Sequence, residues 1–429
     1  MTTFRRIAVV GGGAAGMLAA LAVRAAGQHA TLFERNKRLG IKILISGGGK
    51  CNITHNALPR PMEQGFIPPE ARFLRYAFHT LTADSLLAML HAEGVETFTR
   101  PNGRVFPVSG SADDVLSAFE RMLRRADVEV RTNAHVQSVL VEDGVAVGVQ
   151  LAGKAMPFDA VIVATGGISY RKVGTTGDGI SWGEALGIPV VPLRPALAPI
   201  YFSPPPPAHW QGVALRDVRL TFTPTLQSLG IPNAKHFNQT WRDDLLLTHR
   251  GASGPAVLEI SRAVALAQEA GATPTLIADV APEQTHQDLL DTFLDRLQAS
   301  PTSEIQTLVA GFVPQAVVES VMEQAGIESG RKLGAVRRQE REKLIATLKQ
   351  WRVGTVGEVP IDRGEVTAGG IALRGVGPTT MRSQSVRNLY FAGEALDVAG
   401  RVGGYNLQAA FSTGWAAGQA AATNPEKEE

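Results

Sequence analysis

Apolar runs at the start of the chain predict a strand, a helix and a second strand. Residues 6–10 form a short strand pattern, 14–26 are dense in alanine and leucine, and 30–33 are apolar again. Three consecutive glycines separate the first strand from the helix. This order predicts a βαβ unit. Because the apolar stretch 7–23 opens with these glycines and meets Arg24 early, we expect neither a membrane span nor a signal peptide there.

Similar patterns recur farther along the chain. We predict further strands at residues 128–130, 136–149, 161–164, 213–223 and 388–392, and a small-residue helix at 406–422. The first two of these segments resemble a β-meander, with Asp143-Gly144 as a hairpin turn. Prolines at 192, 195, 199 and 204–207 interrupt the middle of the chain, and helical periodicity dominates 285–349.

The simplest account of this order is an α/β fold in which one domain is inserted into another. A nucleotide-binding domain would consist of residues 1–190 and 355–425, with a parallel sheet of the Rossmann type. A mixed β/α domain would be inserted over 191–354, β-rich at 191–282 and helical at 283–354. The polar C-terminus, 426–429, is expected to be a disordered tail.

The first glycine cluster has the spacing of a dinucleotide-binding turn. Gly11 suits the tight turn, Gly13 lets a pyrophosphate approach the backbone, and Gly16 lets helix and strand pack closely. The unpaired N–H groups at the helix start stabilise phosphate charge. Glu34, at the end of the second strand, suits a ribose 2′-hydroxyl and disfavours NADP. FAD and NAD share this pattern, so other segments must distinguish them.

Three later segments favour FAD. The strand and turn at 161–167 and the strand ending at Gly393-Glu394 are typical of flavoproteins of the two-dinucleotide type, although the usual acid at the second site is Asp. Gly403-Gly404-Tyr405-Asn406 then opens the last helix, whose N-terminus would stabilise negative charge on a reduced flavin. The run Ser46-Gly-Gly-Gly-Lys-Cys-Asn52 can expose several backbone N–H groups to an anion or to the flavin ring.

These motifs also resemble a known family. Segments 39–54, 166–179, 245–258 and 365–414 are similar to those of a bacterial flavoprotein family that includes the YhiN and BaiN proteins, described as NAD(P)/FAD-dependent or aminoacetone oxidase-like oxidoreductases. The likeness covers nearly the whole chain and implies a glutathione-reductase-like FAD domain with an inserted domain. Ile41 and Lys50 stand where arginine is expected, and Arg171 where proline is expected. Lys50 keeps the charge but lacks the bidentate fork of arginine.

The motifs and the resemblance together give one set of residues for non-covalent FAD binding. They are Gly11, Gly13, Ala14, Ala15, Gly16, Glu34, Arg35, Lys42, Ser46, Gly47, Gly48, Lys50, Cys51, Asn52, Val136, Ala164, Thr165, Gly166, Gly167, Gly393, Glu394, Gly404, Tyr405 and Asn406. Cys51 is the only cysteine, so a dithiol mechanism within one chain is excluded, and we interpret its side chain as packing.

The candidate catalytic residues are Asn52, His249 and Tyr405. We expect the substrate between the flavin and the inserted domain, near these residues and Asn406. His249 has a side chain that titrates near neutrality and so could act as an acid or base. A structural histidine fits that position as well. No cluster of His, Asp and Glu has metal-ligand spacing.

Composition limits the partners. With 42 basic and 40 acidic residues the net charge is +2, so we expect no nucleic acid and no membrane surface as partner. A single cysteine is typical of a reducing cytoplasm. The oligomeric state is not indicated.

The chain is therefore predicted to be an FAD-dependent oxidoreductase that acts on an unidentified small molecule by hydride transfer. No second GxGxxG unit occurs. Either NAD(P)H visits as a transient electron donor, or the substrate reduces FAD and oxygen reoxidises it. Two alternatives of other classes stay open, a flavin-dependent RNA-modifying protein and a non-catalytic redox sensor.

Overall fold

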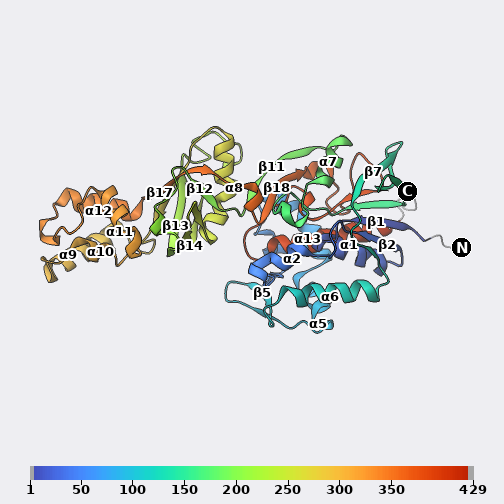
Figure 1. Cartoon of the computed structure of the whole chain (residues 1–429), viewed down its shortest axis with the longest axis horizontal. Helices are drawn as coiled ribbons and strands as arrows, with labels where there is room; N and C mark the ends of the chain where they lie inside the picture. Colours follow the sequence, from blue (N-terminus) through green and yellow to red (C-terminus); the bar gives the residue numbers. More distant parts are fainter. Residues whose placement is uncertain (1–3, 424–429) are drawn as a thin grey trace. The chain divides into compact units, whose positions relative to one another are not determined.

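The first βαβ unit lies at the centre of a parallel sheet in the computed structural model, which describes residues 4–423 (Figure 1). The strand order is β19-β10-β1-β2-β6, and every neighbouring pair is parallel. The strands are β1 (Arg6–Val10), β2 (His29–Phe33), β6 (Glu129–Arg131), β10 (Ala160–Val163) and β19 (Leu389–Phe391). The predicted α/β class with a parallel Rossmann-type sheet is confirmed, and both ends of the sequence build the sheet.

Helices α1 (Ala14–Ala25) and α13 (Tyr405–Ala422) pack against each other unusually closely. A Cβ atom added at Gly414 would lie 2.1 Å from the carbonyl oxygen of Ala15. One added at Gly418 would lie 2.3 Å from that of Ala19. The small residues of α13 are therefore required because the backbones of the two helices nearly touch.

Two smaller antiparallel sheets accompany the parallel one. A three-stranded meander consists of β7 (Val136–Glu142), β8 (Val145–Leu151) and β9 (Lys154–Pro157). Asp143 and Gly144 turn between β7 and β8 with φ of 49° and 74°, as a type I′ hairpin requires. The prediction that 128–130 belong to this meander is wrong. β6 pairs in parallel with β2, a long-range pairing that local alternation does not reveal.

The second small sheet has the order β3-β5-β4. Its strands are β3 (Thr54–His55), β4 (Thr97–Thr99) and β5 (Arg104–Pro107). Helices α2 (Ile41–Ile45), α3 (Pro59–Glu63), α4 (Pro68–Thr80), α5 (Ala83–Ala92), α6 (Ala112–Arg125) and α7 (Asp178–Ala185) complete this part of the chain, with a two-stranded sheet of β11 (Val190–Ala196) and β18 (Val366–Ile371).

The chain divides into two compact units. Unit 1 consists of residues 1–194 and 365–429, and unit 2 of residues 195–364. The second boundary lies ten residues beyond the one expected from the sequence, because β17 (Trp351–Glu358) belongs to the sheet of unit 2. The predicted tail, 426–429, lies outside the described residues.

Unit 2 is built on a closed barrel with the order β12-β15-β14-β13-β16-β17. Its other strands are β12 (Ile200–Phe202), β13 (Ala214–Thr223), β14 (Thr240–Leu247), β15 (Gly251–Ser253) and β16 (Thr275–Asp279). Alternate residues of β13 are buried, among them Val218, Leu220 and Phe222, and they fill the core of this unit with α8 (Pro255–Glu269).

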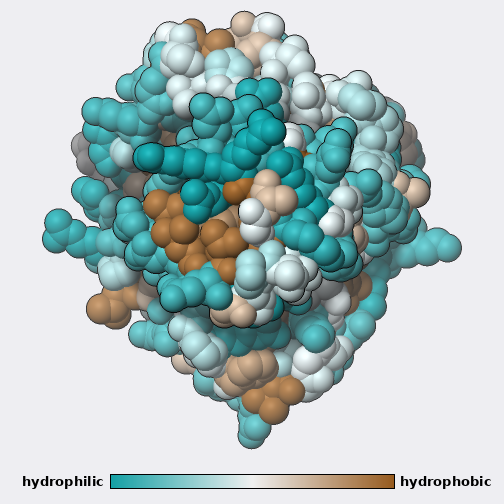
Figure 2. All heavy atoms as spheres, turned by 90° about the vertical axis from the view of Figure 1, so that its left-hand side faces the viewer, coloured by the Kyte–Doolittle hydropathy of each residue, from teal (hydrophilic) through white to brown (hydrophobic). Residues whose placement is uncertain are grey.

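The remaining helices of unit 2 lie together beside the barrel (Figure 1). They are α9 (His286–Ala299), α10 (Ile305–Val309), α11 (Gln315–Ala325) and α12 (Arg338–Lys349). Figure 2 faces the side of Figure 1 on which these helices are drawn and shows an apolar patch framed by hydrophilic atoms. Leu294 of α9 is 40% exposed, and Leu290 and Leu297 on the same helix are partly buried.

No helix within residues 4–423 is long and apolar enough to cross a bilayer. The N-terminal apolar stretch consists of β1, the glycine turn and α1, and both elements are almost wholly buried in unit 1.

Candidate active site

The three motif glycines in the turn between β1 and α1 differ in what surrounds them. A Cβ at Gly11 would lie 2.4 Å from the carbonyl oxygen of Ala164, and one at Gly16 would lie 1.8 Å from that of Gly11. A Cβ at Gly13 would meet nothing within 4 Å. Gly11 and Gly16 are thus needed for packing, while Gly13 faces open space at the start of α1, where a pyrophosphate would lie.

Glu34 is held at the end of β2 by three hydrogen bonds. Its Oε2 accepts from the backbone N of Gly12 at 2.8 Å, and its Oε1 accepts from the backbone N and from Nδ2 of Asn36, both at 2.8 Å. The carboxylate is therefore fixed beside the glycine turn, in the place that a ribose-binding acid requires.

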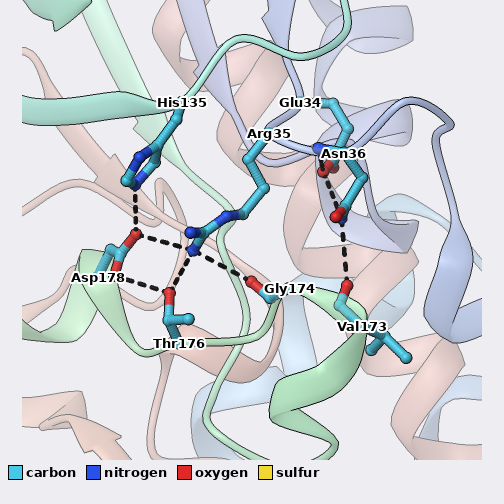
Figure 3. Close-up of polar contacts among 8 residues, drawn as sticks. All are labelled: Glu34, Arg35, Asn36, His135, Val173, Gly174, Thr176 and Asp178. Atoms are coloured by element: carbon cyan, nitrogen blue, oxygen red, sulfur yellow. Dashed lines mark hydrogen bonds and ion pairs between the residues drawn. The ribbon is translucent and has the colours of Figure 1, made fainter.

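Arg35 and Asn36 anchor a distant segment at the same strand end (Figure 3). The Arg35 guanidinium donates to Oγ1 of Thr176 at 2.6 Å and pairs with Asp178 at 3.3 Å. The same carboxylate lies 3.1 Å from Nε2 of His135, the neighbour of the predicted cofactor residue Val136. Asn36 donates to the carbonyl of Val173 at 3.1 Å. Arg35 thus holds the segment of Thr176 and Asp178 near the end of β2, where the nucleotide is expected to bind. No sequence motif indicated this role.

A second polar cluster joins the ends of four segments. Lys42 pairs with Glu394 and donates to Oγ of Ser169 at 2.7 Å. Oε1 of Glu394 accepts from Oγ of Ser169 at 3.0 Å and from the backbone N of Thr367 at 2.9 Å. Oγ1 of Thr367 in turn accepts from the backbone N of Ile168 and of Ser169, at 2.9 and 3.0 Å.

This cluster explains why glutamate replaces the usual aspartate. Glu394 must reach Lys42, Ser169 and Thr367 at once, and the extra methylene provides that reach. Gly167 lies against the same group, because a Cβ there would be 2.4 Å from Oγ1 of Thr367. Ser169 and Thr367 were not predicted. Both are fully buried, and both lie in segments that resemble the family without belonging to a glycine or acid motif.

The strand end at 164–167 borders the glycine turn. Ala164 donates its backbone N–H to the carbonyl of Val10 at 2.8 Å, and Gly166 turns the chain with φ of 74°. Gly393 donates its backbone N–H to Oγ1 of Thr413 on α13 at 3.0 Å. β10, β19 and α13 thus bring the predicted residues 164–167 and 393–394 to the same edge of the sheet as Gly11.

The glycine run after α2 forms an exposed loop in left-handed conformation. Gly47, Gly48 and Gly49 have φ of 56°, 68° and 84°, and Lys50 is exposed beside them. Cys51 is fully buried, and burial raises the pKa of its thiol to about 12, against the opposing effect of a hydrogen bond with Ser46. The thiol therefore stays protonated at neutral pH, which supports packing over redox chemistry.

Asn52 ties this loop to the start of α13. With both ends of the amide satisfied, its oxygen accepts from the backbone N of Gly404 at 3.0 Å, and its nitrogen donates to the carbonyls of Thr54 and Val105 at 3.2 and 3.3 Å. Gly404 has φ of 93°, and a Cβ there would lie 2.3 Å from the backbone of Thr54. The Asn52 amide therefore links this loop to the start of α13.

Tyr405 and Asn406 are likewise held by neighbours. The Tyr405 ring stacks on His55, with centroids 4.5 Å apart and planes 19° apart. Oδ1 of Asn406 accepts from the backbone N of Gly400 at 2.8 Å, and its Nδ2 donates to the carbonyls of Gly400 and Arg401. The Asn406 side chain fixes the loop that leads to the helix.

His55 was missed by the sequence reasoning, since it stands in no motif. Its Nδ1 lies 3.2 Å from the carbonyl oxygen of Gly403, so Nδ1 carries the proton in the neutral ring. Burial lowers the pKa of His55, as does the nearby Arg104, while the bond to Gly403 acts in the other direction. The ring is therefore mostly neutral at physiological pH.

Glu365, at the start of β18, is a further charged group that was not predicted. Desolvation by the surrounding protein raises the pKa of its carboxyl group, and the positive charges of Lys42 and Arg104 oppose that shift. The side chain remains open to solvent. The carboxyl group of Glu365 therefore interacts electrostatically with both Lys42 and Arg104 in unit 1.

His249, by contrast, belongs to unit 2. It lies exposed in the tight turn between β14 and β15, where the backbone N of Thr248 donates to the carbonyl of Gly251 at 2.8 Å. The assignment of His249 to catalysis stays a prediction. Within residues 4–423 no group of three or more His, Cys, Asp or Glu could hold a metal ion.

The chain matches a family model and is similar to curated proteins over nearly their full length. The model for the HI0933-like protein Rossmann domain matches residues 5–420. The chain belongs to the HI0933-like family. A 3-dehydro-bile acid delta(4,6)-reductase of Clostridium scindens is 30% identical, over 98% of this chain and all of that protein. A ribosomal RNA dihydrouridine synthase of Escherichia coli is also 30% identical, over 96% of each chain.

The solved structures agree with this fold. A 3-ketosteroid delta1-dehydrogenase from Sterolibacterium denitrificans is similar with a TM-score of 0.53, at 13% identity, over 98% of this chain and all of that one. The resemblance drawn from the sequence motifs is confirmed. This HI0933-like protein is an FAD-dependent oxidoreductase, and the residues around Gly13, Glu34 and Glu394 fit that cofactor.

Proposed function

We propose that this HI0933-like protein reduces a carbon–carbon double bond conjugated to a carbonyl group, with NAD(P)H as the source of electrons. The observation that carries the proposal is the pair of full-length relatives. One is named for removing double bonds from a 3-dehydro bile acid, and the other for forming dihydrouridine, in which a ring double bond of uridine is saturated. Two chemically different substrates thus undergo the same kind of reaction, which supports that reaction for this protein as well.

Such a double bond is reduced in two parts. Its β-carbon accepts a hydride because the carbonyl takes up the resulting negative charge, and its α-carbon then accepts a proton. FAD, when bound, supplies two-electron hydride transfer between donor and substrate. Each turnover consumes one NAD(P)H and one proton, and it yields NAD(P)⁺ and the saturated product.

The residues of unit 1 suit the electrostatic part of this reaction. The start of α13 carries partial positive charge, and Asn52 holds it in place through Gly404. The exposed left-handed glycines 47–49 can present backbone N–H groups to a carbonyl oxygen or to an anion. Both features would stabilise negative charge that develops during hydride transfer.

The electron donor that we propose is a nicotinamide that binds transiently. A second GxGxxG unit is absent from the sequence, so NAD(P)H would bind transiently rather than on a nucleotide domain of its own. Among the candidate catalytic residues, we propose positioning roles for Asn52 and Tyr405 because both side chains are held by protein contacts. His249 remains a candidate acid or base.

The proposal is tested with the purified holoprotein under anaerobic conditions. NADH or NADPH is mixed with a panel of conjugated carbonyl compounds that includes a steroid enone and uridine-containing RNA, and products are analysed by mass spectrometry. We expect consumption of the nicotinamide only with a suitable acceptor, together with a product that has gained two hydrogen atoms. Turnover that requires oxygen and leaves every double bond intact would refute the proposal and indicate an oxidase.

A further inference from the structure

Helix α9 carries a stripe of leucines that its own unit covers only in part. Leu290, Leu294 and Leu297 follow one another at intervals of four and three residues, so they lie on one face of the helix. Leu294 is 40% exposed, and the other two are partly buried. The face beside them, with the buried Leu289 and Phe293, already packs into the core of unit 2. The leucine stripe is thus apolar surface beyond what the packing of α9 requires.

Helix α12 lies beside α9 (Figure 1). Nζ of Lys349, at the end of α12, donates to the carbonyl of Gln284 at 2.8 Å, just before α9 begins. The guanidinium carbon of Arg341, in the first turn of α12, lies 5.6 Å from the centroid of the Phe293 ring in the middle of α9. The two helices therefore run in opposite directions, and the part of α9 from Asp291 onward is level with the first half of α12.

The exposed charges of these two helices are opposite in sign. Asp291 and Asp295 are exposed on α9, and Arg338 and Lys343 are exposed on α12. Within residues 4–423, none of these four side chains has an oppositely charged group within ion-pair distance, although several other charged groups of the two helices are paired. The two helices thus present apolar side chains together with unpaired acids on α9 and unpaired bases on α12.

We propose that two copies of this chain associate through unit 2, with α9 of each copy packed on α12 of the other. A two-fold axis that lies between α9 and α12 and runs parallel to both helices produces this arrangement. Rotation about such an axis keeps every residue at its own level along the helices. The two acids of one copy therefore come opposite the two bases of the other, and the leucine stripes are covered between them. The surface is complementary to itself in its apolar part and in its charges.

Charge distinguishes this arrangement from other ways of covering the leucine stripe. A two-fold axis perpendicular to the helices would place α9 on α9 and bring the acids of both copies together, which costs binding free energy. An anionic membrane surface would be repelled by the same acids, Asp291 and Asp295. Helix α12 of a second copy, by contrast, offers bases at the level of these acids.

The size of the surface sets the strength of the association. Helix α9 has 14 residues and α12 has 12, so they are about 21 and 18 Å long. With axes about 10 Å apart, the pair of helices covers roughly 400 Å² on each copy. A standard stable interface covers about 800 Å² on each partner. We therefore expect a reversible dimer with a dissociation constant on the order of 10 μM or weaker.

The experiment measures the oligomeric state of the full-length holoprotein by sedimentation velocity, over protein concentrations from about 1 to 200 μM. We expect a monomer–dimer equilibrium. Leu294→Asp places a charge in the middle of the leucine stripe, so the dimer should weaken at least about tenfold. Leu58→Asp is the matched control, because it changes a leucine of unit 1 that is 67% exposed and lies outside the proposed surface. Its association should equal that of the parent protein.

Reversing the charges tests which helices meet. Asp291→Lys and Lys343→Asp each place like charges at both edges of a homodimer, so we expect either variant alone to associate about tenfold more weakly. Mixed in equal amounts, the two variants form a heterodimer in which opposite charges meet again at both edges, so the parental affinity should return. Lys235→Asp, at an exposed lysine of unit 2 outside the four helices, is the control and should have no effect.

A chain that stays monomeric at every concentration would overturn the inference. Stronger association of Asp291→Lys alone would indicate α9 packed on α9 and would overturn it as well. So would a monomeric chain that binds phosphatidylserine vesicles through Leu294. If Leu294→Asp loses its folded circular dichroism, the mixture of the two charge variants decides, because both of their positions are exposed.

Discussion

The two units differ in where their charged side chains lie. In unit 1, Lys42 and Glu394 are turned inward and joined to Ser169 and Thr367, both fully buried, at the ends of four segments. In unit 2, several charged side chains pair across the outer surface of the barrel, while Lys349 and the enclosed Asp279 pair between α12 and β16. Arg242, for example, bonds Asp217, which is 59% exposed, at 2.7 Å.

This difference distinguishes charged groups that could build a binding site from charged groups that only pair on the surface of a packed core. Exposed ion pairs typically contribute about 0–1 kcal/mol and impose little geometry. An enclosed network costs desolvation but holds its members in one arrangement, as a cofactor site requires. The enclosed network of unit 1, unlike the Lys349–Asp279 pair of unit 2, joins predicted cofactor residues, and we propose cofactor chemistry there. Unit 2 is stabilised mainly by the apolar core of its barrel and helices.

The largest expected effect tests whether the two units are separable. Phe222→Ala removes a ring that is 1% exposed in the barrel core, so we expect unit 2 to lose about 3–5 kcal/mol of stability. Unit 1 should keep its FAD. Thermal unfolding followed separately by intrinsic fluorescence and flavin absorbance measures both. Parallel loss of flavin would contradict the separation, and Phe222→Leu serves as a milder control.

A substitution at the start of α13 should damage unit 1 selectively. Gly404→Ala places a Cβ 2.3 Å from the Thr54 backbone at a positive φ, so we expect a loss of about 2–4 kcal/mol and little bound FAD. Gly271→Ala in unit 2 is the control, because its φ is also positive but a Cβ there meets nothing within 4 Å. Equal effects of both substitutions would mean that backbone conformation alone, and not the site, is responsible.

Shortening the acid at 394 should have a smaller effect. Glu394→Asp cannot reach Lys42, Ser169 and Thr367 together, and we expect FAD to dissociate about tenfold more readily, equivalent to about 1.4 kcal/mol. Titration of the apoprotein with FAD measures this. Unchanged affinity would show that the aspartate of related flavoproteins serves equally well here. Glu358→Asp, on an exposed strand end of unit 2, is a matched control.

His55 should make stability depend on pH. Because its pKa is lowered in the folded protein, its contribution is present above the ordinary histidine pKa of 6.5 and is lost as pH falls through the folded value. The stability advantage of the parent protein over His55→Phe should therefore be larger near about pH 8 than near about pH 5. Urea unfolding at both values checks this, and a constant difference would contradict the assigned neutral ring.

The smallest structural effect is expected at His249. It is exposed in a turn of unit 2, so His249→Ala should change stability by less than about 0.5 kcal/mol and leave the FAD content unchanged. Turnover then decides its role. If the imidazole is the acid or base, the rate falls by about 100-fold or more. An unchanged rate would remove His249 from the mechanism.

The sequence predicted those parts of unit 1 that depend on local spacing. Gly11, Gly13, Gly16 and Glu34 belong to one βαβ unit, so their arrangement follows from the chain itself. The position of β6 did not follow, because parallel pairing with β2 is a long-range contact.

The site beyond the glycine turn could be predicted only in part. Glu394 was identified from its motif, but its partners Ser169 and Thr367 lie far away in sequence and carry no signal of their own. His55 became visible only through its stacking on Tyr405.

The most direct test of the central claim is a single turnover without a nicotinamide. The bound flavin is reduced photochemically under anaerobic conditions, and a conjugated carbonyl substrate is added while the visible band is followed. We predict that the yellow band returns and that one double bond is saturated for each flavin reoxidised. A flavin that stays bleached with every such substrate, and recovers only when oxygen is admitted, would contradict the account.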